Sequence, residues 1–214
     1  MAGANLQRVY REGKELRFLF DNRALLGLHL MLHGKMVLFD KKNTEKNTVA
    51  AIYFEDDSGL AITDFQGMAL LSLNPEEKES PDALSRKISP AYLKQALSHT
   101  RKKIKDVLLD QKIIRGIGNA YADEILWDAG ISPFSVSEKI PPGKISALAK
   151  SIKKVLKAAG KLIIKKHPGI IVGEVRDFLL IHNPKKKHSP TGALIKHTNK
   201  SRKTYYTDEQ VQFK

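Results

Sequence analysis

The first third of the chain contains short apolar segments separated by polar, turn-forming residues. From Leu16 to Ile62 these segments are LRFLF, ALLGLHLML, KMVLF, TVAAIYF and GLAIT. Asp21–Asn22, Lys41–Asn47 and Asp56–Gly59 separate them as predicted turns. Several strands at roughly ten-residue spacing indicate an antiparallel sheet, packed as a sandwich or a partial barrel.

Beyond residue 90 the spacing of apolar residues becomes helical. The pattern predicts a helix over Pro90–Leu97, one capped by Thr100 that runs to Leu109, one over Asn119–Ala129, and a long one over Lys144–Lys166. The long helix has an apolar stripe with lysines opposite. A basic amphipathic helix can lie on a membrane, but a core helix with a solvated lysine face is the favoured interpretation. The segment FLLIH is also predicted to be helical. TGALIKH and RKTYYT are predicted to pair as a β-hairpin.

These patterns predict an α+β chain with four parts. Residues 1–73 form a β-sandwich domain, and residues 74–90, polar and with three prolines, form a linker. Residues 91–182 form a helical domain, and residues 183–214 contain the hairpin.

Charge is divided unevenly between these parts. The chain of 214 residues has a net charge of +14. Residues 1–90 hold 12 basic and 13 acidic side chains, whereas residues 91–214 hold 25 basic and 10 acidic ones. A basic module beside a neutral one points to a polyanion, usually nucleic acid, with an acidic membrane surface as the lesser possibility. A lysine-rich surface without a partner is the remaining alternative.

Cysteine is absent, which excludes disulfides, thiolate nucleophiles and cysteine-ligated metal centres. The chain has no run of 18 apolar residues, and its first residues lack the apolar core of a secretory signal. We therefore expect a cytoplasmic protein without a membrane partner, nucleoid-associated if it is bacterial.

The strongest local feature is Leu108–Gly130, with the sequence LLDQKIIRGIGNAYADEILWDAG. Gly116 and Gly118 allow positive φ and a close approach to a partner. Asn119 is a favoured N-cap, and the helix that follows presents free N–H groups and a positive dipole end. With Lys112 and Arg115 beside it, this turn predicts a phosphate-binding site. An ordinary helix–turn–helix corner that needs glycine for its geometry is the alternative.

The stretch DQKIIRGIGNAYADEILWDAGISP closely resembles the helix–two-turns–helix motif of the formamidopyrimidine-DNA glycosylase and endonuclease VIII family. Upstream, YREGKELRFLF and LGLHLMLHGKMVLF resemble the family's β-sandwich. Downstream, FLLIHNPKKKHSPTGALIKHTNKSRKTYYTDEQ resembles its C-terminal finger. The resemblance implies a β-sandwich, a helix–two-turns–helix domain and a finger. It covers most of the chain from about Tyr10 onward.

The resemblance also implies roles for individual residues. Asn119 and Lys112 match the residues that bind phosphates flanking the lesion, and Arg202 matches the finger arginine that grips the phosphate of the extruded nucleotide. Lys14 matches the sandwich lysine that reaches the damaged base or its phosphate. Glu124 matches a glutamate near the catalytic pocket. Lys14 and Glu124 are thus candidates for the pocket, while the catalytic residues themselves are not identified from the sequence.

The chain departs from the family pattern at its start. Family members begin with a Pro-Glu pair after the initiator Met, and the proline amine attacks the anomeric carbon of the sugar. This sequence starts MAGANLQ, so we expect the N-terminal helix and the first strands to be absent. The exposed amine of Ala2 would lie at a point that leads into the sandwich.

Two further departures concern the finger and the residues that fill the gap left by base flipping. His188, Thr191, Thr207 and Gln210 stand where the family has four cysteines, and one histidine among them cannot hold zinc. A zincless finger without a metal or other cofactor is expected. Leu32 stands near the position of the family's inserted methionine, as an apolar wedge. Phe65 or Gln66 substitutes for the family's Arg and Phe.

The leading interpretation is a monomer that binds double-stranded DNA, damaged or abasic, in the manner of a base-excision-repair glycosylase. Catalysis is doubtful without the Pro-Glu pair, although Lys14 could form a Schiff base with an abasic site and give weak lyase activity. The alternative is a non-catalytic paralogue that recognises damaged or bent DNA. A basic RNA-binding protein is a third, weaker interpretation, because it leaves the sandwich and finger resemblance unexplained.

Overall fold

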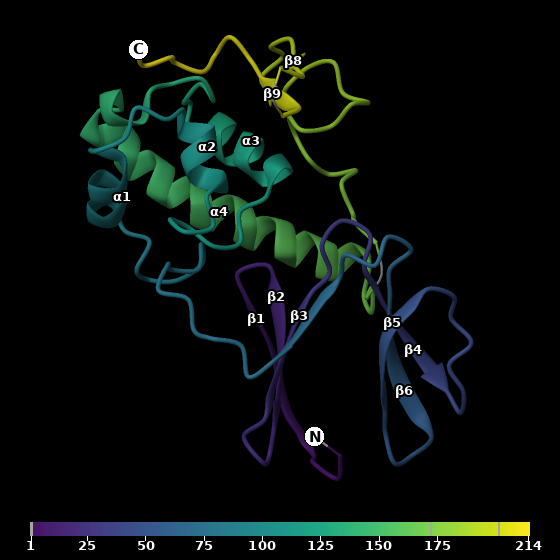
Figure 1. Cartoon of the computed structure of the whole chain (residues 1–214). Helices are drawn as coiled ribbons and strands as arrows, with labels where there is room; N and C mark the ends of the chain where they lie inside the picture. The colour runs from purple at the N-terminus through teal and green to yellow at the C-terminus, as the bar shows by residue number, and fades with distance from the viewer. Residues whose placement is uncertain (1, 172, 201) are drawn as a thin grey trace. The chain divides into compact units, whose positions relative to one another are not determined.

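The computed structural model describes residues 2–171, 173–200 and 202–214 (Figure 1). The chain divides into two compact units. Unit 1 comprises residues 1–77 and 167–174, and unit 2 comprises residues 78–166 and 175–214. Each unit has its own apolar core.

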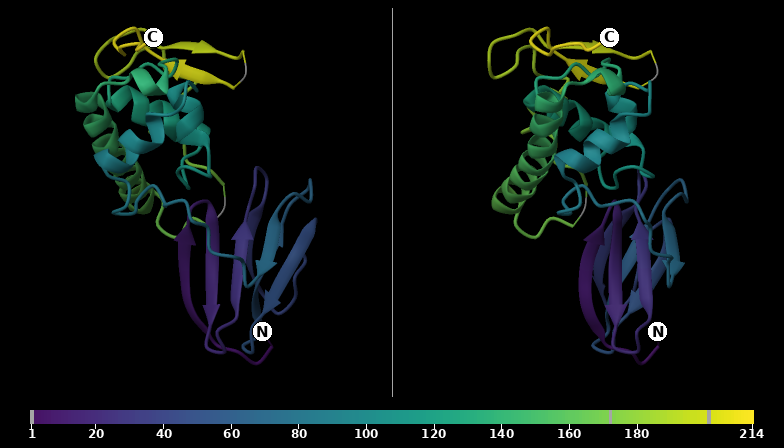
Figure 2. Two further views of the ribbon diagram at one scale, coloured as in Figure 1. Left: turned by 60° about the vertical axis from the view of Figure 1, so that its left-hand side comes forward. Right: turned by 90° about the vertical axis from the view of Figure 1, so that its left-hand side faces the viewer.

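Unit 1 is a sandwich of two antiparallel sheets. One sheet has the order β1-β2-β3-β7 and the other β4-β6-β5. The strands are β1 (Leu6–Glu12), β2 (Glu15–Phe20), β3 (Leu25–His29), β4 (Lys35–Asp40), β5 (Thr48–Tyr53), β6 (Ser58–Thr63) and β7 (Leu70–Leu73). Figure 2 shows strands β1–β3 and β4–β6 as two layers. Phe18 and Leu28 from the first sheet meet Leu60 and Ile62 from the second in one buried cluster.

The predicted sandwich is confirmed, with two strands more than the apolar segments indicated. Strand β1 is mostly exposed and β7 is short and mostly exposed, so neither carries the apolar signal of a buried strand. The predicted turn over Asp56–Gly59 is wrong at its end. Ser58 and Gly59 already belong to β6, where they pair with Asp40 and Phe39 of β4.

Unit 2 contains four α-helices, one short 3-10 turn and a hairpin among its described residues. They are α1 (Pro90–Leu97), α2 (Ile104–Leu109), α3 (Asn119–Asp128), η1 (Ser137–Lys139) and α4 (Pro142–Lys166), followed by β8 (Lys196–Thr198) and β9 (Thr204–Tyr206). The helices bury leucine and isoleucine side chains in one core, among them Leu93, Ile104, Ile125 and Leu148. Strands β8 and β9 pair antiparallel, as the sequence predicted.

The structure of unit 2 differs from the predictions for Thr100 and for the segment FLLIH. Thr100 does not cap α2, because the N-cap is Lys103 and the Thr100 hydroxyl accepts a bond from the N–H of Lys102 instead. The segment FLLIH, residues 178–182, forms turns and bends rather than a helix. The N–H groups of its last three residues, 180–182, donate to the carboxylate of Glu124, so they are not available for helical bonds.

Among the described residues, no helix is long and apolar enough to cross a membrane. The longest, α4, has 25 residues, and lysines recur along its whole length opposite the apolar stripe.

Candidate nucleic-acid interface

The turn between α2 and α3 is held in shape by the side chain of Gln111. Its Nε2 donates to the carbonyl oxygens of Leu109 and Ile117 at 3.0 and 3.1 Å, and its Oε1 accepts from the N–H of Gly116 at 2.9 Å. Gly116 has φ 104°, a backbone conformation that side chains with a Cβ rarely adopt. One amide group thus closes a turn whose shape depends on a glycine.

The start of α3 differs from the prediction. Gly118 is the N-cap, with φ −107° and ψ 172°, and Asn119 is the first helical residue. The prediction that Asn119 is the N-cap is therefore wrong, and of the two glycines only Gly116 has a positive φ. Released from capping, the Asn119 side chain is used elsewhere.

Asn119 joins the turn to the β8–β9 hairpin. Its Nδ2 donates to the carbonyl oxygen of Lys203 at 2.9 Å, while its buried Oδ1 has no partner among the described residues. Arg202 directly precedes Lys203, and its side chain is 57% exposed, with Nη1 3.9 Å from Oδ1 of Asp106. The fold therefore brings Asn119 and Arg202, which are far apart in the sequence, onto one surface of unit 2.

A buried polar cluster centred on Asp123 supports this junction. Oδ1 of Asp123 lies 2.6 Å from Nζ of Lys105, and Oδ2 lies 2.7 Å from Nδ1 of His182 and accepts from the N–H of Tyr205 at 2.9 Å. Lys105 also donates to Thr204 Oγ1 at 2.8 Å. Burial lowers the pKa of Lys105, and the charge of Asp123 opposes that shift. The cluster ties α2 and α3 to the hairpin that carries Arg202.

Glu124 holds the segment that follows α4. Its carboxylate accepts three backbone N–H groups, from Leu180 at 2.9 Å and from Ile181 and His182 at 2.7 Å. The side chain is buried. With both oxygens engaged by the backbone, Glu124 has a structural role in this fold, and its place near a catalytic pocket stays a prediction.

The two basic residues of the turn have different surroundings. Lys112 is exposed, and its N–H donates to Asp110 Oδ1 at 3.0 Å. Arg115 is buried, and its Nε donates to the carbonyl oxygen of Ser80 at 2.5 Å. Lys112 is thus accessible to a ligand and Arg115 is largely covered, and the phosphate contacts of both residues stay predictions.

In unit 1, Lys14 lies in the turn between β1 and β2. It is exposed and follows Gly13, which has φ 62°. The β-turn therefore presents the lysine at one end of the sandwich's first sheet.

Unit 1 also carries an exposed apolar tip, formed by Met31, Leu32, Phe65 and Met68. Leu32 is 79% exposed and Phe65 is 65% exposed. The two loops touch, because the His33 ring lies 4.6 Å from that of Phe65. The sequence predicted Leu32 as a wedge and left Phe65 or Gln66 open as its companion. The ring contact places Phe65 beside the Leu32 loop.

Asp64 shapes the loop that carries Phe65. Its carboxylate accepts the N–H groups of Gln66, Met68 and Ala69 at 2.8 to 2.9 Å. These bonds, that from Gln66 first, lower the pKa of the Asp64 carboxyl. The apolar tip is therefore mounted on a loop with a fixed backbone.

The four positions that match the family's zinc cysteines do not fit a metal. His188, Thr191, Thr207 and Gln210 supply one imidazole, two hydroxyls and an amide. Gln210 accepts from the N–H of Thr207 at 2.9 Å and donates to the Ile131 carbonyl at 2.8 Å. The described residues contain no group of three or more His, Cys, Asp or Glu that could hold a metal ion.

Side-chain bonds around Glu209 close this part of the hairpin instead. Its Oε2 accepts from Thr207 at 3.1 Å and from Trp127 and Ser189 at 3.4 Å. Such hydroxyl donors, Thr191 first, lower the pKa of the Glu209 carboxyl. A hydrogen-bond network thus stands where the family pattern has a metal centre.

Two protein-family models match the chain. Residues 80–166 match the formamidopyrimidine-DNA glycosylase H2TH domain, and residues 1–70 match the formamidopyrimidine-DNA glycosylase N-terminal domain. The first match contains the helix–turn–helix unit described above, and the second contains most of the sandwich.

Curated relatives carry the same description. The formamidopyrimidine-DNA glycosylase of Carboxydothermus hydrogenoformans is 34% identical over 156 residues, which cover 73% of this chain and 59% of the relative. That of Lactiplantibacillus plantarum is 30% identical, with 71% of this chain and 59% of the relative covered. The chain thus spans about three fifths of the length of these relatives.

Solved structures of the formamidopyrimidine-DNA glycosylase (Fpg) of Lactococcus lactis resemble this chain over nearly its whole length. A complex with DNA containing an abasic site has a TM-score of 0.83 and 25% identity, covering 96% of this chain and 81% of that one. A complex with a THF-DNA and an inhibitor has a TM-score of 0.85 and 26% identity, covering 99% of this chain and 83% of that one. Together with the two family models and the curated relatives, these structures show that the chain belongs to the formamidopyrimidine-DNA glycosylase family.

Proposed function

We propose that this chain binds damaged or abasic double-stranded DNA as a protein of the base-excision-repair glycosylase type. The observation that carries the proposal is the Asn119–Lys203 hydrogen bond, which joins the helix–two-turns–helix turn to the hairpin. It brings the amide of Asn119 against the backbone next to Arg202, whose guanidinium is exposed. Amide and guanidinium N–H groups can both donate to phosphate oxygens.

Charge supports a polyanionic partner for unit 2. Residues 91–214 hold 25 basic and 10 acidic side chains. Lys112 and Arg202 are exposed at the turn and at the hairpin. Within the described part of the chain, the carboxylate nearest to Arg202 is that of Asp106, at 3.9 Å. Phosphate contacts of this kind give affinity that does not depend on base sequence.

Recognition of damage is assigned to unit 1. The apolar tip exposes Leu32 and Phe65, and an apolar side chain can fill the space that an extruded or missing base leaves in the stack. Relatives of known structure were solved with abasic-site DNA and with DNA containing an oxidised pyrimidine. Either kind of lesion weakens stacking locally, which lowers the cost of inserting a wedge.

Binding to a duplex with one tetrahydrofuran abasic analogue, measured by fluorescence anisotropy across a salt series, tests the proposal. Each lost phosphate contact should lower the slope of log affinity against log salt by about 0.9. We expect this change for Arg202→Ala and no change for Lys161→Ala on α4, which removes the same charge far along the helix. Equal slopes for wild type and Arg202→Ala would refute the assignment of this arginine.

Cleavage is a separate proposal, because binding and turnover make different demands on the chain. A non-catalytic paralogue would make the same phosphate contacts. Borohydride trapping on abasic DNA separates the two. An amine such as that of Lys14 would add to the open-chain aldehyde, lose water to give an imine, and be reduced to a stable cross-link. A cross-link lost in Lys14→Ala supports lyase chemistry, and the absence of any cross-link supports the non-catalytic paralogue.

As a DNA-binding protein, the chain is proposed to associate with the nucleoid in a bacterial cell.

A further inference from the structure

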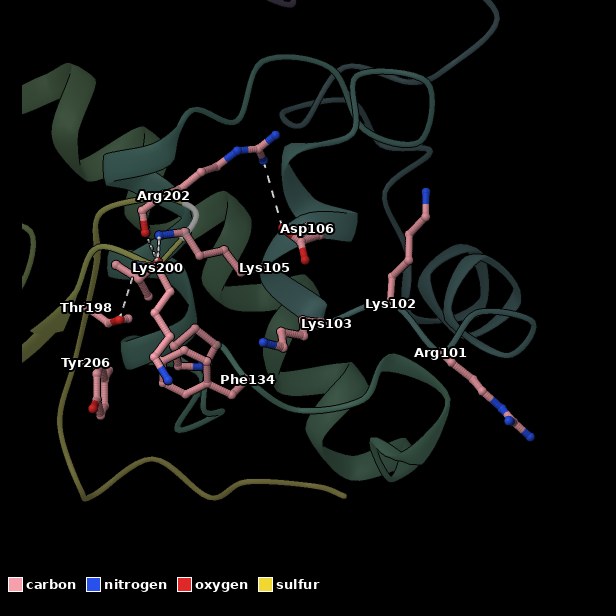
Figure 3. Close-up of a pocket in the computed structure, with 12 residues that line it drawn as sticks. Arg101, Lys102, Lys103, Lys105, Asp106, Phe134, Thr198, Lys200, Arg202 and Tyr206 are labelled. Carbon is pink, nitrogen blue, oxygen red and sulfur yellow. Dashed lines mark hydrogen bonds and ion pairs between the residues drawn. The ribbon is translucent and has the colours of Figure 1, made fainter.

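Unit 2 contains a basic groove that shares only Arg202 with the phosphate contacts proposed above. Its volume is about 580 Å³, and it is bounded by residues 101–106, by Pro133 and Phe134, and by the β8–β9 hairpin (Figure 3). Six of its lining side chains are Lys or Arg, and one, Asp106, is acidic. A concave site of this size is within the range that holds a nucleotide-sized ligand.

Aromatic rings form part of the groove's wall. Phe134 and Tyr206 meet edge to face, with ring centroids 5.0 Å apart and an interplanar angle of 86°. Such a contact uses one ring face and one ring edge, so other ring faces of the pair remain for a further partner. The Lys103 ammonium lies 5.6 Å from the centre of the Phe134 ring.

The basic side chains of the groove differ in their carboxylate partners and in the direction in which they point. Lys105 is buried against Asp123. Figure 3 shows Lys103 and Lys200 directed toward Phe134 from two different segments, whereas Arg101 and Lys102 point outward. Among the described residues, neither Lys103 nor Lys200 has an ion pair with a carboxylate. The inner part of the groove therefore combines two exposed cations with an aromatic ring.

This combination favours one kind of polyanion. In a duplex the faces of the bases are hidden in the stack, so a ring between two cations has nothing to stack on. In an unpaired strand, bases stack on aromatic side chains while the phosphates on either side meet lysines. An acidic peptide would use the cations and leave the ring without a role.

We propose that the groove binds unpaired nucleotides of a DNA strand, with one base on Phe134 and its neighbouring phosphates on Lys103 and Lys200. The proposal extends the proposed function and rests on it for the identity of the polymer, because Arg202 also lines the groove. It assigns a second binding mode, for single-stranded DNA, beside the duplex contacts of Lys112 and Asn119.

A labelled thymidine oligonucleotide of about six residues, long enough to follow such a groove, is the probe. Lys103→Ala/Lys200→Ala tests the cations, and Lys157→Ala/Lys161→Ala on α4 is the control with the same loss of charge. Phe134→Leu removes the ring, and Phe134→Tyr keeps it. Anisotropy is measured over a salt series for each variant.

The two kinds of groove variant should give different results. Loss of the two lysines should lower the salt slope by about 1.4, at 0.7 per single-strand phosphate contact. Phe134→Leu should weaken binding about tenfold with an unchanged slope, because stacking carries no counterion release, and Phe134→Tyr should bind like wild type. The α4 control should bind like wild type.

Three outcomes would overturn the inference. Binding that is insensitive to Phe134→Leu would exclude a stacked base. An equal effect of the α4 control would show attraction by net charge only. A glutamate peptide that displaces the oligonucleotide and binds Phe134→Leu as well as wild type would identify the groove as a site for acidic peptides.

The abasic duplex, tested with the same variants, separates this inference from the proposed function. Loss of duplex binding in Arg202→Ala but not in Phe134→Leu supports both assignments. Failure of wild type to bind the duplex while it still binds the oligonucleotide refutes only the proposed function.

Discussion

The buried Lys105–Asp123 ion pair permits a sharp test of how the hairpin is held. Its Nζ and Oδ1 atoms are 2.6 Å apart, and the side chains are 6% and 0% exposed. Asp123 also binds His182 and the N–H of Tyr205, so it connects α3 to two later segments of the chain. Asp123→Asn, Lys105→Met and the double variant separate the charge pair from the rest of the cluster.

The magnitude follows from what each change leaves behind. Asp123→Asn leaves a buried ammonium without its counter-ion, at a cost of about 3–5 kcal/mol. The lower end is expected, because Lys105 keeps Thr204 Oγ1 as an acceptor and the new amide oxygen can still accept from Tyr205. Lys105→Met leaves a buried carboxylate and should cost a similar amount. The double variant buries no charge, so its cost should be about 2–3 kcal/mol below the sum of the single costs.

Urea unfolding followed by circular dichroism measures the four free energies of unfolding. Affinity for abasic duplex should follow the same order, because the pair anchors the hairpin that carries Arg202. Asp106→Asn serves as a control, because its carboxylate is about half exposed and 3.9 Å from Arg202. It should change the free energy of unfolding by less than about 1 kcal/mol. Additive costs in the cycle would refute the argument that the pair acts as a buried unit.

Three further predictions test other parts of the structure. Glu124→Gln places an amide N–H₂ group opposite a backbone N–H that the carboxylate now accepts. The free energy of unfolding should fall by about 2 kcal/mol, and amide hydrogen exchange at residues 180–182 should become faster. Unchanged exchange would contradict the role of the carboxylate. The pKa of the Asp64 carboxyl is lowered in the folded state, so the carboxylate contributes its full stabilisation above its ordinary pKa of 3.8 and loses it as the pH falls through the lowered value. The difference in the free energy of unfolding between wild type and Asp64→Asn should therefore shrink in acid. A difference that stays constant with pH would contradict this. Leu32→Ser should weaken binding of abasic duplex about tenfold and leave intact duplex unaffected, whereas Leu38→Ser, at another exposed leucine, should change neither; equal losses on both duplexes would refute a wedge at Leu32.

The helices of unit 2 were predictable because their apolar residues recur at helical spacing. Helix α1 was predicted with its observed bounds, and α3 and α4 to within two residues. The predicted helix at FLLIH was wrong for a physical reason. Its run of apolar residues indicates a buried segment but does not distinguish a helix from a buried turn. Its conformation is decided by Glu124, 54 residues before its first residue, and local propensity cannot report such a partner.

The candidate interface was predictable to the extent that it depends on a local motif. The turn glycines, Lys112 and Asn119 lie in one stretch, and the family resemblance added Arg202. The Asp123 cluster was missed, because Lys105, His182 and Tyr205 are scattered through the sequence. A signal was present in the sequence of α3, where the adjacent acids Asp123 and Glu124 stand between Ala122 and Ile125. The structure buries both acids, and buried carboxylates require partners. The basic groove was also missed, because its aromatic residues Phe134 and Tyr206 come from segments that are far apart in the sequence and meet only in the fold.

The most direct test of the central claim is the affinity of the chain for two duplexes that differ at one position. One carries a tetrahydrofuran abasic analogue and the other the intact nucleotide, and both are measured by anisotropy at physiological salt. Damaged-DNA binding requires the abasic duplex to bind at least about tenfold more tightly, since filling the gap buries apolar side chains that an intact stack leaves exposed. Equal affinity for the two duplexes would show a protein that attracts DNA by charge alone, and would contradict the account.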